Sequence, residues 1–240
     1  LASGLGDIYE LGRVFRAEES GRHHNREFTM LEWYRVGWSY HQLMDEVAQL
    51  VRHCWPEESL PESRFSYRQL FLEFVGIDPF EADLSDLRGK LEAAGIELAD
   101  SHRAECLDLL LSSVIQPQLN PRHLTFVYDF PADQAALARI RKRSPDVAER
   151  FELFIGPLEL ANGYQELTEP DEQLERFQRE NEARNNAGLA TTPLDVNLIE
   201  ALRAGLPPCS GVALGVDRLL MALTGATSLN EVIAFPADRA

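Results

Sequence analysis

The segment RVFRAEESGRHHNREFTMLEWYR, which runs from Arg13 to Arg35, decides the fold because it joins two expected strands through a long polar loop. The flanking residues predict one strand over Ile8–Phe15 and a second over Phe28–Arg35. The connection is long for a hairpin, and long ordered loops on a sheet often carry function. Its residue types suit a nucleotide: arginine for phosphate oxygens, acids for a metal or an amine, and an aromatic face for a base.

The composition is that of an acidic globular protein. The chain has 240 residues, of which 45% are hydrophobic and 26% charged, and its net charge is −16. This length provides an ample core, in one large domain or two small ones. The acidic balance disfavours broad binding to nucleic acid but leaves room for a small basic pocket. No apolar run is long enough for a membrane span, and the start shows no signal-peptide pattern.

The three cysteines, Cys54, Cys106 and Cys209, lie far apart and follow no CxxC spacing. This arrangement disfavours a disulfide framework or a zinc ribbon and favours a reducing cytoplasm. We expect Cys209 to be a small packed residue.

Outside the opening segment, hydrophobic periodicity and turn residues predict helices separated by short strands. Ser39 is the expected N-cap of the first helix. Helices are expected over 39–54, 68–75, 83–94, 100–115, 172–186, 194–204 and 217–223, and further strands over 64–67, 124–130, 148–155, 158–167 and 211–216. This order predicts a single α+β domain over 1–240 with a mostly antiparallel sheet and a helical insertion at about 57–120.

The segment ELANGYQE contains two acids, Glu159 and Glu166, that face opposite ways in a regular strand. A bulge at Asn162-Gly163 would bring both carboxylates to one side, where they could bind Mg²⁺ bridging phosphates. The alternative is a pair of solvated carboxylates, and the segment alone favours that alternative.

The segment GVALGVDR has glycines at 211 and 215, which permit close approach of a ligand to the backbone, and places Arg218 in the first turn of a helix. The alternative is a tightly packed strand–helix junction with Asp217 as a helix-start acid. The segment lacks the ending of a phosphate loop. The adjacent His23 and His24 are expected to structure the loop, with one of them near phosphate, rather than to bind a metal.

Taken together, these segments resemble the class II aminoacyl-tRNA synthetases. FRAEE…HHNREFTMLEWY is similar to motif 2 of that family and GVALGVDRLLMAL to motif 3, while ELANGYQEL lies between them as in the lysyl branch. Within this branch, the chain most resembles the ligases that attach a lysine-type amino acid to elongation factor P. The segments that carry this resemblance are FRAEESGRHHN, ELANGYQELTEP and CSGVALGVDRL. The resemblance runs from Leu1 to Ala240 and implies the class II fold. It also implies an AMP-forming ligase that uses ATP and Mg²⁺, acts in the cytoplasm on lysine or (R)-β-lysine, and forms a homodimer at full length.

The resemblance also implies roles for individual residues. Arg16 and Arg218 would act in catalysis, with Arg16 on the α-phosphate and Arg218 stacking with Phe28 on the adenine. ATP would be bound by Arg16, Ala17, Glu18, Asn25, Phe28, Glu159, Leu160, Gly215 and Arg218. The amino acid would be bound by Glu32, Tyr34, Asn162, Glu166 and Ala213, and the metal by Glu159 and Glu166.

Ala213 supports a β-lysine-type substrate over α-lysine. Lysyl-tRNA synthetases typically carry glycine at this position, and a methyl group would reshape the pocket floor. Two departures from the family pattern stand out. Motif 1 and the serine-proline-glutamate loop would lie upstream of Leu1, so an N-terminal part of the domain is expected to be missing, and Arg26 stands where the family usually has proline.

Two other functions stay open at this point. One is a lysyl-tRNA synthetase core that charges tRNA, which the acidic balance disfavours. The other is a non-catalytic regulator that keeps the fold as a ligand sensor, against which the full set of Arg16, Glu159, Glu166 and Arg218 argues.

Overall fold

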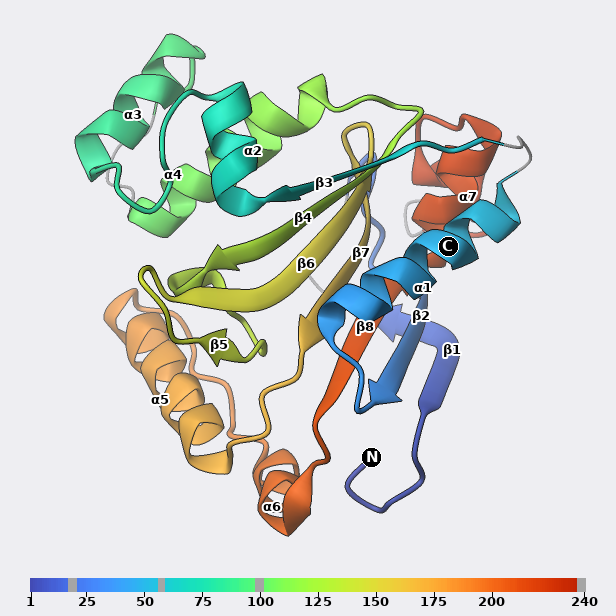
Figure 1. Cartoon of the computed structure of the whole chain (residues 1–240), viewed down its shortest axis with the longest axis vertical. Helices are drawn as coiled ribbons and strands as arrows, with labels where there is room; N and C mark the ends of the chain where they lie inside the picture. Colours follow the sequence, from blue (N-terminus) through green and yellow to red (C-terminus); the bar gives the residue numbers. More distant parts are fainter. Residues whose placement is uncertain (17–20, 56–58, 98–101, 237–240) are drawn as a thin grey trace.

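The computed structural model describes residues 1–16, 21–55, 59–97 and 102–236. Its centre is one sheet in the order β1-β2-β8-β7-β6-β4-β3, with β5 beside β6 (Figure 1). All neighbours pair antiparallel except β3 and β4, which are parallel. The expected α+β class with a mostly antiparallel sheet is confirmed. The strands are β1 Ile8–Phe15, β2 Glu27–Val36, β3 Glu62–Ser66, β4 Leu124–Pro131, β5 Ile140–Arg141, β6 Val147–Ile155, β7 Leu158–Gln165 and β8 Cys209–Gly215.

The helices follow the expected pattern with small shifts at their ends. They are α1 Tyr40–Cys54, α2 Tyr67–Phe74, α3 Leu84–Ala93, α4 Arg103–Leu109, α5 Pro170–Asn186, α6 Val196–Gly205 and α7 Val216–Thr224. The single helix expected over 100–115 is instead α4 followed by a π-helical turn, Leu110–Ile115. Tyr67, expected to end a strand, begins α2, because Ser66 and Gln69 form a capping box that starts the helix one residue earlier.

Helix α1 shows how the local sequence sets an element. Ser39 caps it by accepting a hydrogen bond from the backbone of Gln42, and the Gln42 side chain accepts one from the backbone N–H of Ser39. One face of the helix is fully buried, including Leu43, Val47 and Val51. That face packs against the sheet, so the helix crosses in front of β6–β8 in Figure 1.

Two apolar cores lie on the two faces of the sheet. The first is formed by α1 with residues such as Trp33, Phe151 and Leu214. The second is formed by α2, α3 and α4 with residues such as Val127 and Phe154. The second core covers the β3–β4–β6 end of its face, at the upper left of Figure 1. On that same face, β2, β8 and β7 present polar and small side chains.

The bulge expected at Asn162-Gly163 lies elsewhere. Strand β7 pairs regularly with β6 through both residues, and the register shifts at Leu160, between the pairs Leu153–Ala161 and Phe154–Glu159. Gly163 is needed for another reason, since a Cβ there would lie 2.4 Å from the Phe151 ring. Since cross-strand partners share a face, the shift puts Glu159 on the face that carries Asn162 and Glu166.

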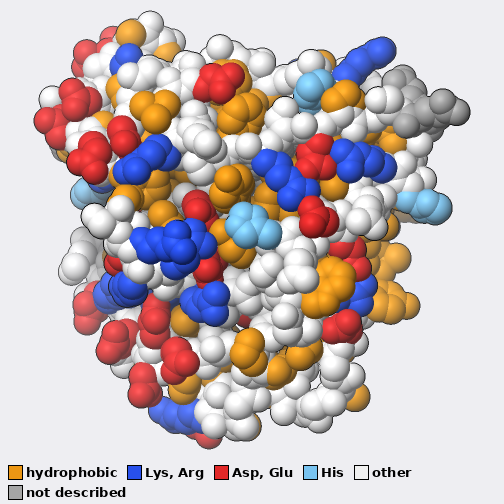
Figure 2. All heavy atoms as spheres, viewed as in Figure 1, with side chains coloured by type: hydrophobic (Ala, Val, Ile, Leu, Met, Phe, Trp, Pro, Cys, Tyr) orange, Lys and Arg blue, Asp and Glu red, His pale blue; other side chains and the backbone are white. Residues whose placement is uncertain are grey.

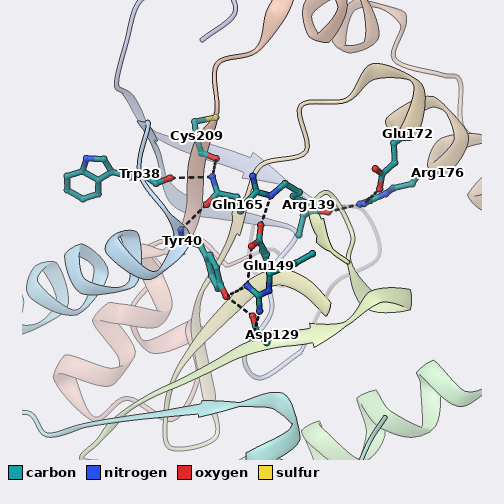
Figure 3. A network of polar contacts seen from close by, with 11 residues as sticks. Trp38, Tyr40, Asp129, Arg139, Glu149, Gln165, Glu172, Arg176 and Cys209 are labelled. Atoms are coloured by element: carbon teal, nitrogen blue, oxygen red, sulfur yellow. Dashed lines mark hydrogen bonds and ion pairs between the residues drawn. The ribbon is translucent and has the colours of Figure 1, made fainter. Parts of the chain in front are cut away.

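A polar network joins the start of α1 to the ends of the strands (Figure 3). The Gln165 side chain accepts a hydrogen bond from the backbone of Tyr40 and donates to the carbonyl of Cys209, at 3.1 and 2.9 Å. The Tyr40 hydroxyl donates to Asp129 at 2.6 Å and accepts from Arg141 at 3.1 Å. These contacts fix the strand end from which Glu166 projects.

The surface is mixed and predominantly acidic. Figure 2 shows acidic side chains gathered over α3 and α5, while apolar side chains reach the surface beside β1. Cys209 is fully buried, as expected. In the described part of the chain, no helix combines the length and apolarity that a bilayer crossing requires.

Candidate active site

A cavity of about 310 Å³ lies on the polar face of the sheet. Its floor comes from β2, β6, β7 and β8, and its rim from the segment that precedes β2 and from the start of α7. The lining consists of Arg16, His23, His24, Asn25, Phe28, Thr29, Met30, Arg150, Glu152, Glu159, Leu160, Ala161, Asn162, Ala213, Gly215, Asp217, Arg218 and Leu229.

Most residues expected in the site line this one cavity. The structure brings together Arg16, Asn25, Phe28, Glu159, Leu160, Asn162, Ala213, Gly215 and Arg218. Glu32, Tyr34 and Glu166 are outside the lining and lie further along the same face. Ala17 and Glu18 fall outside the described residues.

The rim segment is held from two sides. The guanidinium of Arg16 lies over the Phe28 ring at 5.3 Å from its centroid, a cation–π geometry. Arg22 donates to the carbonyl of Thr227 at 2.6 Å, and its own carbonyl accepts from Leu229 at 3.0 Å. Burial, as the main cause, lowers the pKa of His23 and so favours the neutral imidazole at the rim.

Arg218 crosses the cavity from α7. Its guanidinium donates to the carbonyl of Glu159 at 3.0 Å, lies 3.5 Å from the Glu159 carboxylate, and donates to the carbonyl of His23 at 3.3 Å. One side chain therefore connects the third sequence segment to the other two.

Asp217 also makes a contact between elements, which was not expected from its position at the start of a helix. Its carboxylate accepts a hydrogen bond from the backbone of Thr29 at 2.6 Å. Met30 pairs with Gly215 on the adjacent strand, so this bond sets the approach of β2 to α7.

Arg150 and Glu152 are lining residues that the sequence analysis missed. Glu152 is 7% exposed and accepts hydrogen bonds from Arg150 and from Asn162, the latter at 3.4 Å. Burial raises the pKa of Glu152 to about 7, Arg150 opposes this rise, and Glu159 adds to it. The available signal was the segment RFELFI, in which an acid interrupts an otherwise apolar strand.

A row of side chains crosses the sheet floor. Glu32 pairs with Ala213, Ala213 with Asn162, and Asn162 with Glu152. The Asn162 Oδ1 atom is buried and has no hydrogen-bond partner among the described residues. A buried acceptor without a donor indicates a position for a ligand N–H or a water molecule.

The next row holds the remaining expected residues. Tyr34 pairs with Gly211 and Gly211 with Tyr164. Glu166 packs so closely here that a Cβ on Gly211 would lie 2.4 Å from its Oε1 atom and 2.5 Å from the Tyr34 ring. Burial, with a smaller effect from Glu32, raises the pKa of Glu166 to about 8. A cationic ligand group would stabilise the ionised form of this carboxyl.

No group of three or more His, Cys, Asp or Glu side chains within the described ranges is arranged to hold a metal ion. Three carboxylates line the cavity, of which Asp217 accepts the backbone N–H of Thr29 and the other two form a pair, Glu152 and Glu159. Mg²⁺ commonly uses one or two protein carboxylates and takes its other ligands from substrate phosphates and water. The pair is therefore compatible with a metal–nucleotide complex.

Comparison with known proteins agrees with this geometry. Residues 1–239 match the family described as tRNA synthetases class II (D, K and N). The chain is 50% identical over 243 residues to a Yersinia enterocolitica protein named elongation factor P--(R)-beta-lysine ligase, a match that covers 100% of this chain and 74% of that protein. Proteins with this name from Vibrio vulnificus and Salmonella typhi are 47% and 49% identical, with 98% and 100% of this chain and 73% and 74% of those proteins covered.

The cavity joins the motif 2-like, ELANGYQEL and motif 3-like segments, and both the family match and these relatives extend over nearly the entire chain. The chain belongs to the class II tRNA synthetase family of the D, K and N group.

Proposed function

We propose that this chain is an ATP-dependent, AMP-forming ligase that activates a lysine-type amino acid, (R)-β-lysine in the first instance, and transfers it to a lysine of elongation factor P. The observation that carries the proposal is the single cavity that combines Arg16, Phe28, Arg218 and two carboxylates. The names of relatives at 47–50% identity support the choice of acceptor and amino acid. The cytoplasm, where translation takes place, is the proposed location.

The nucleotide would lie along the rim. Adenine would stack on Phe28, with Arg218 on its other side, and the α-phosphate would face Arg16. Asn25 and the backbone at Leu160 and Gly215 would complete this part of the site. Ala17 and Glu18 are proposed from sequence alone.

The metal-binding pair that we propose is Glu159 and Glu166, as expected from the sequence. Glu159 lines the cavity, and the register shift at Leu160 puts it on the face of β7 that also carries Glu166. A bound Mg²⁺ would neutralise phosphate charge at this position.

The amino acid would lie over the two rows of the sheet floor. Glu32 and Glu166 are acids that could face its ammonium groups, and Tyr34 and Asn162 would add hydrogen bonds. Ala213 places a methyl group within the first of these rows, which suits a carbon chain shaped differently from that of α-lysine.

In the first step, a carboxylate oxygen of the amino acid attacks the α-phosphorus of ATP, pyrophosphate leaves, and an aminoacyl-adenylate forms. In the second, the ε-amine of the acceptor lysine attacks the acyl carbon, AMP leaves with the bonding electrons, and the amine loses a proton as the amide forms. Arg16 and Arg218 stabilise negative charge that develops on the phosphate, and the cavity aligns the reactants. The reaction requires no nucleophilic side chain.

Isotope exchange between pyrophosphate and ATP tests the first step, with α-lysine and (R)-β-lysine as separate substrates. We expect exchange with at least one isomer. The Arg218→Ala variant should lose at least about two orders of magnitude in rate, since it removes a guanidinium that stacks on the adenine and adds positive charge near the phosphates. Arg203→Ala, which removes an exposed arginine of α6, is the matched control. Absence of exchange with every lysine isomer would refute the proposal.

Mass spectrometry of elongation factor P after incubation with ATP and each isomer tests the second step. A mass increase of one lysyl group on a lysine side chain is the expected result. The runner-up function is charging of tRNA, which the family match favours and the net charge of −16 disfavours. Aminoacylated tRNA without any modified elongation factor P would favour that alternative.

A further inference from the structure

The side chain of Gln165, the last residue of β7, links this strand to two other parts of the chain. Its Oε1 atom accepts a hydrogen bond from the backbone N–H of Tyr40, the first residue of α1, at 3.1 Å. Its Nε2 atom donates to the carbonyl of Cys209 in β8 at 2.9 Å and to that of Trp38 at 3.3 Å (Figure 3). The amide is therefore engaged as donor and as acceptor, and the residue is only 6% exposed.

The carbonyl of Cys209 also holds the residue that follows Gln165. It accepts a second hydrogen bond from the backbone N–H of Glu166 at 3.0 Å. On the other side, Glu166 forms an antiparallel bridge with Ala138, and the carbonyl of Gln165 accepts from the backbone of Arg139 at 2.8 Å. The backbone of Glu166 thus lies between β8 and the segment that precedes β5, and Gln165 ties this arrangement to the start of α1.

Gln165 and Glu166 serve opposite faces of the sheet, because successive side chains of a strand alternate. Gln165 contacts α1, while Glu166 packs beside Tyr34 on the face that carries the cavity. Loss of the amide would leave the buried N–H of Tyr40 without this acceptor, a cost that a shift of the strand end would relieve. An amide on one face therefore determines the place of a carboxylate on the other.

A second buried glutamine provides an internal comparison. Gln173 in α5 is 3% exposed, and its Nε2 atom has no hydrogen-bond partner among the described residues. Neither glutamine belongs to the cavity lining. The two residues match in chemistry and burial, but the Gln173 amide nitrogen holds no backbone group in place.

We propose that Gln165 is a positioning residue that fixes the Glu166 carboxylate where it meets an ammonium group of the lysine-type substrate. The inference rests on the proposed function and adds a residue to its amino-acid site. Gln165 acts through the Cys209 carbonyl and the backbone of Glu166, and it makes no contact of its own with the substrate. A charge-assisted hydrogen bond is short and directional, so a small shift of the carboxylate weakens binding of the amino acid.

Pyrophosphate exchange at a series of amino-acid concentrations measures the KM for the amino acid. For Gln165→Met we expect this KM to rise roughly tenfold, the effect of one hydrogen bond to a charged group. The affinity for α,β-methylene ATP, measured by calorimetric titration without metal, should stay unchanged. Gln165→His, whose imidazole keeps one donor and one acceptor, should recover part of the loss. Gln173→Met, the matched control, should retain the KM of the unmodified protein.

A double-mutant cycle separates positioning from a general structural role. In a Glu166→Gln background, Gln165→Met should cause little further rise in the KM, because residues that act as a unit are not additive. Additive effects, or an equal loss of nucleotide affinity in Gln165→Met, would overturn the inference, since they indicate that Gln165 does not act through Glu166. If Gln165→Met does not fold, Gln165→His takes its place in the same cycle.

The two proposals fail in different ways. Absence of pyrophosphate exchange with every lysine isomer in the unmodified protein would count against the proposed function. Normal exchange there, with a Gln165→Met variant that keeps the KM for the amino acid, would refute only the inference about Gln165.

Discussion

Glu166 is a half-buried acid in surroundings that oppose its ionisation. It packs against Gly211 and Tyr34, and burial raises its pKa from 4.5 to about 8. Because the folded pKa lies above the unfolded one, the folded protein keeps a proton that the unfolded chain loses. This contribution to stability is complete below pH 4.5 and is lost as pH rises through about 8.

The free energy of unfolding should therefore fall between about pH 5 and pH 8, by an amount on the order of a few kcal/mol from this group. Glu166→Gln, which cannot ionise, should lack this part of the pH dependence. Urea denaturation at a series of pH values measures the difference between the two proteins. Parallel profiles for both proteins would show that Glu166 ionises normally.

At the scale of elements, the site depends on how closely β6, β7 and β8 approach one another. Gly163 allows that approach: a Cβ there would lie 2.4 Å from the Phe151 ring and 2.9 Å from the carbonyl of Gly211. The first neighbour belongs to the core under α1 and the second to the strand that carries Ala213. A change at one glycine would thus act on both the core and the floor of the cavity.

We expect Gly163→Ala to destabilise the protein by roughly 1–3 kcal/mol through overpacking. Gly89→Ala is the control, because that glycine lies on the exposed face of α3 and a Cβ there meets no atom within 4 Å. The control should be stabilised by about 0.5–1 kcal/mol, since alanine favours a helix over glycine. Chemical denaturation measures both, and equal effects of the two substitutions would contradict the packing argument.

At the scale of the whole molecule, β1 is an edge strand with an apolar surface. Tyr9, Leu11 and Phe15 are 78%, 60% and 72% exposed, and β1 pairs only with β2 among the described strands. Exposed apolar edges of this kind are uncommon on monomers and are typical of interfaces. The homodimer expected from the family resemblance is therefore proposed to form along β1.

Sedimentation velocity tests this assembly on the full-length protein. We expect a dimer, and Leu11→Lys should shift the population to monomer by placing a charge in the interface. Leu72→Lys, which changes an exposed leucine of α2, should leave the dimer unchanged. A dimer that survives Leu11→Lys unaltered would place the interface elsewhere.

The sequence by itself determined the elements, the fold class and the family, because these depend on local signals: strand alternation, the Ser39 cap, and the residues of the motif 2- and motif 3-like segments. Segments far apart in the sequence could be assigned to one site because each carries its own chemistry, as Arg16, Glu159 and Arg218 do.

Only the tertiary structure decided which face each side chain takes. The bulge at Leu160 depends on how β7 pairs with β6, and no local signal distinguishes it from the expected bulge at Asn162-Gly163. Arg150 and Glu152 were missed for the same reason, since an acid in an apolar strand becomes a site residue only when the opposing strands and α4 enclose it. Strand register, burial and enclosure depend on contacts between residues that are far apart in the sequence, and those contacts exist only in the folded chain.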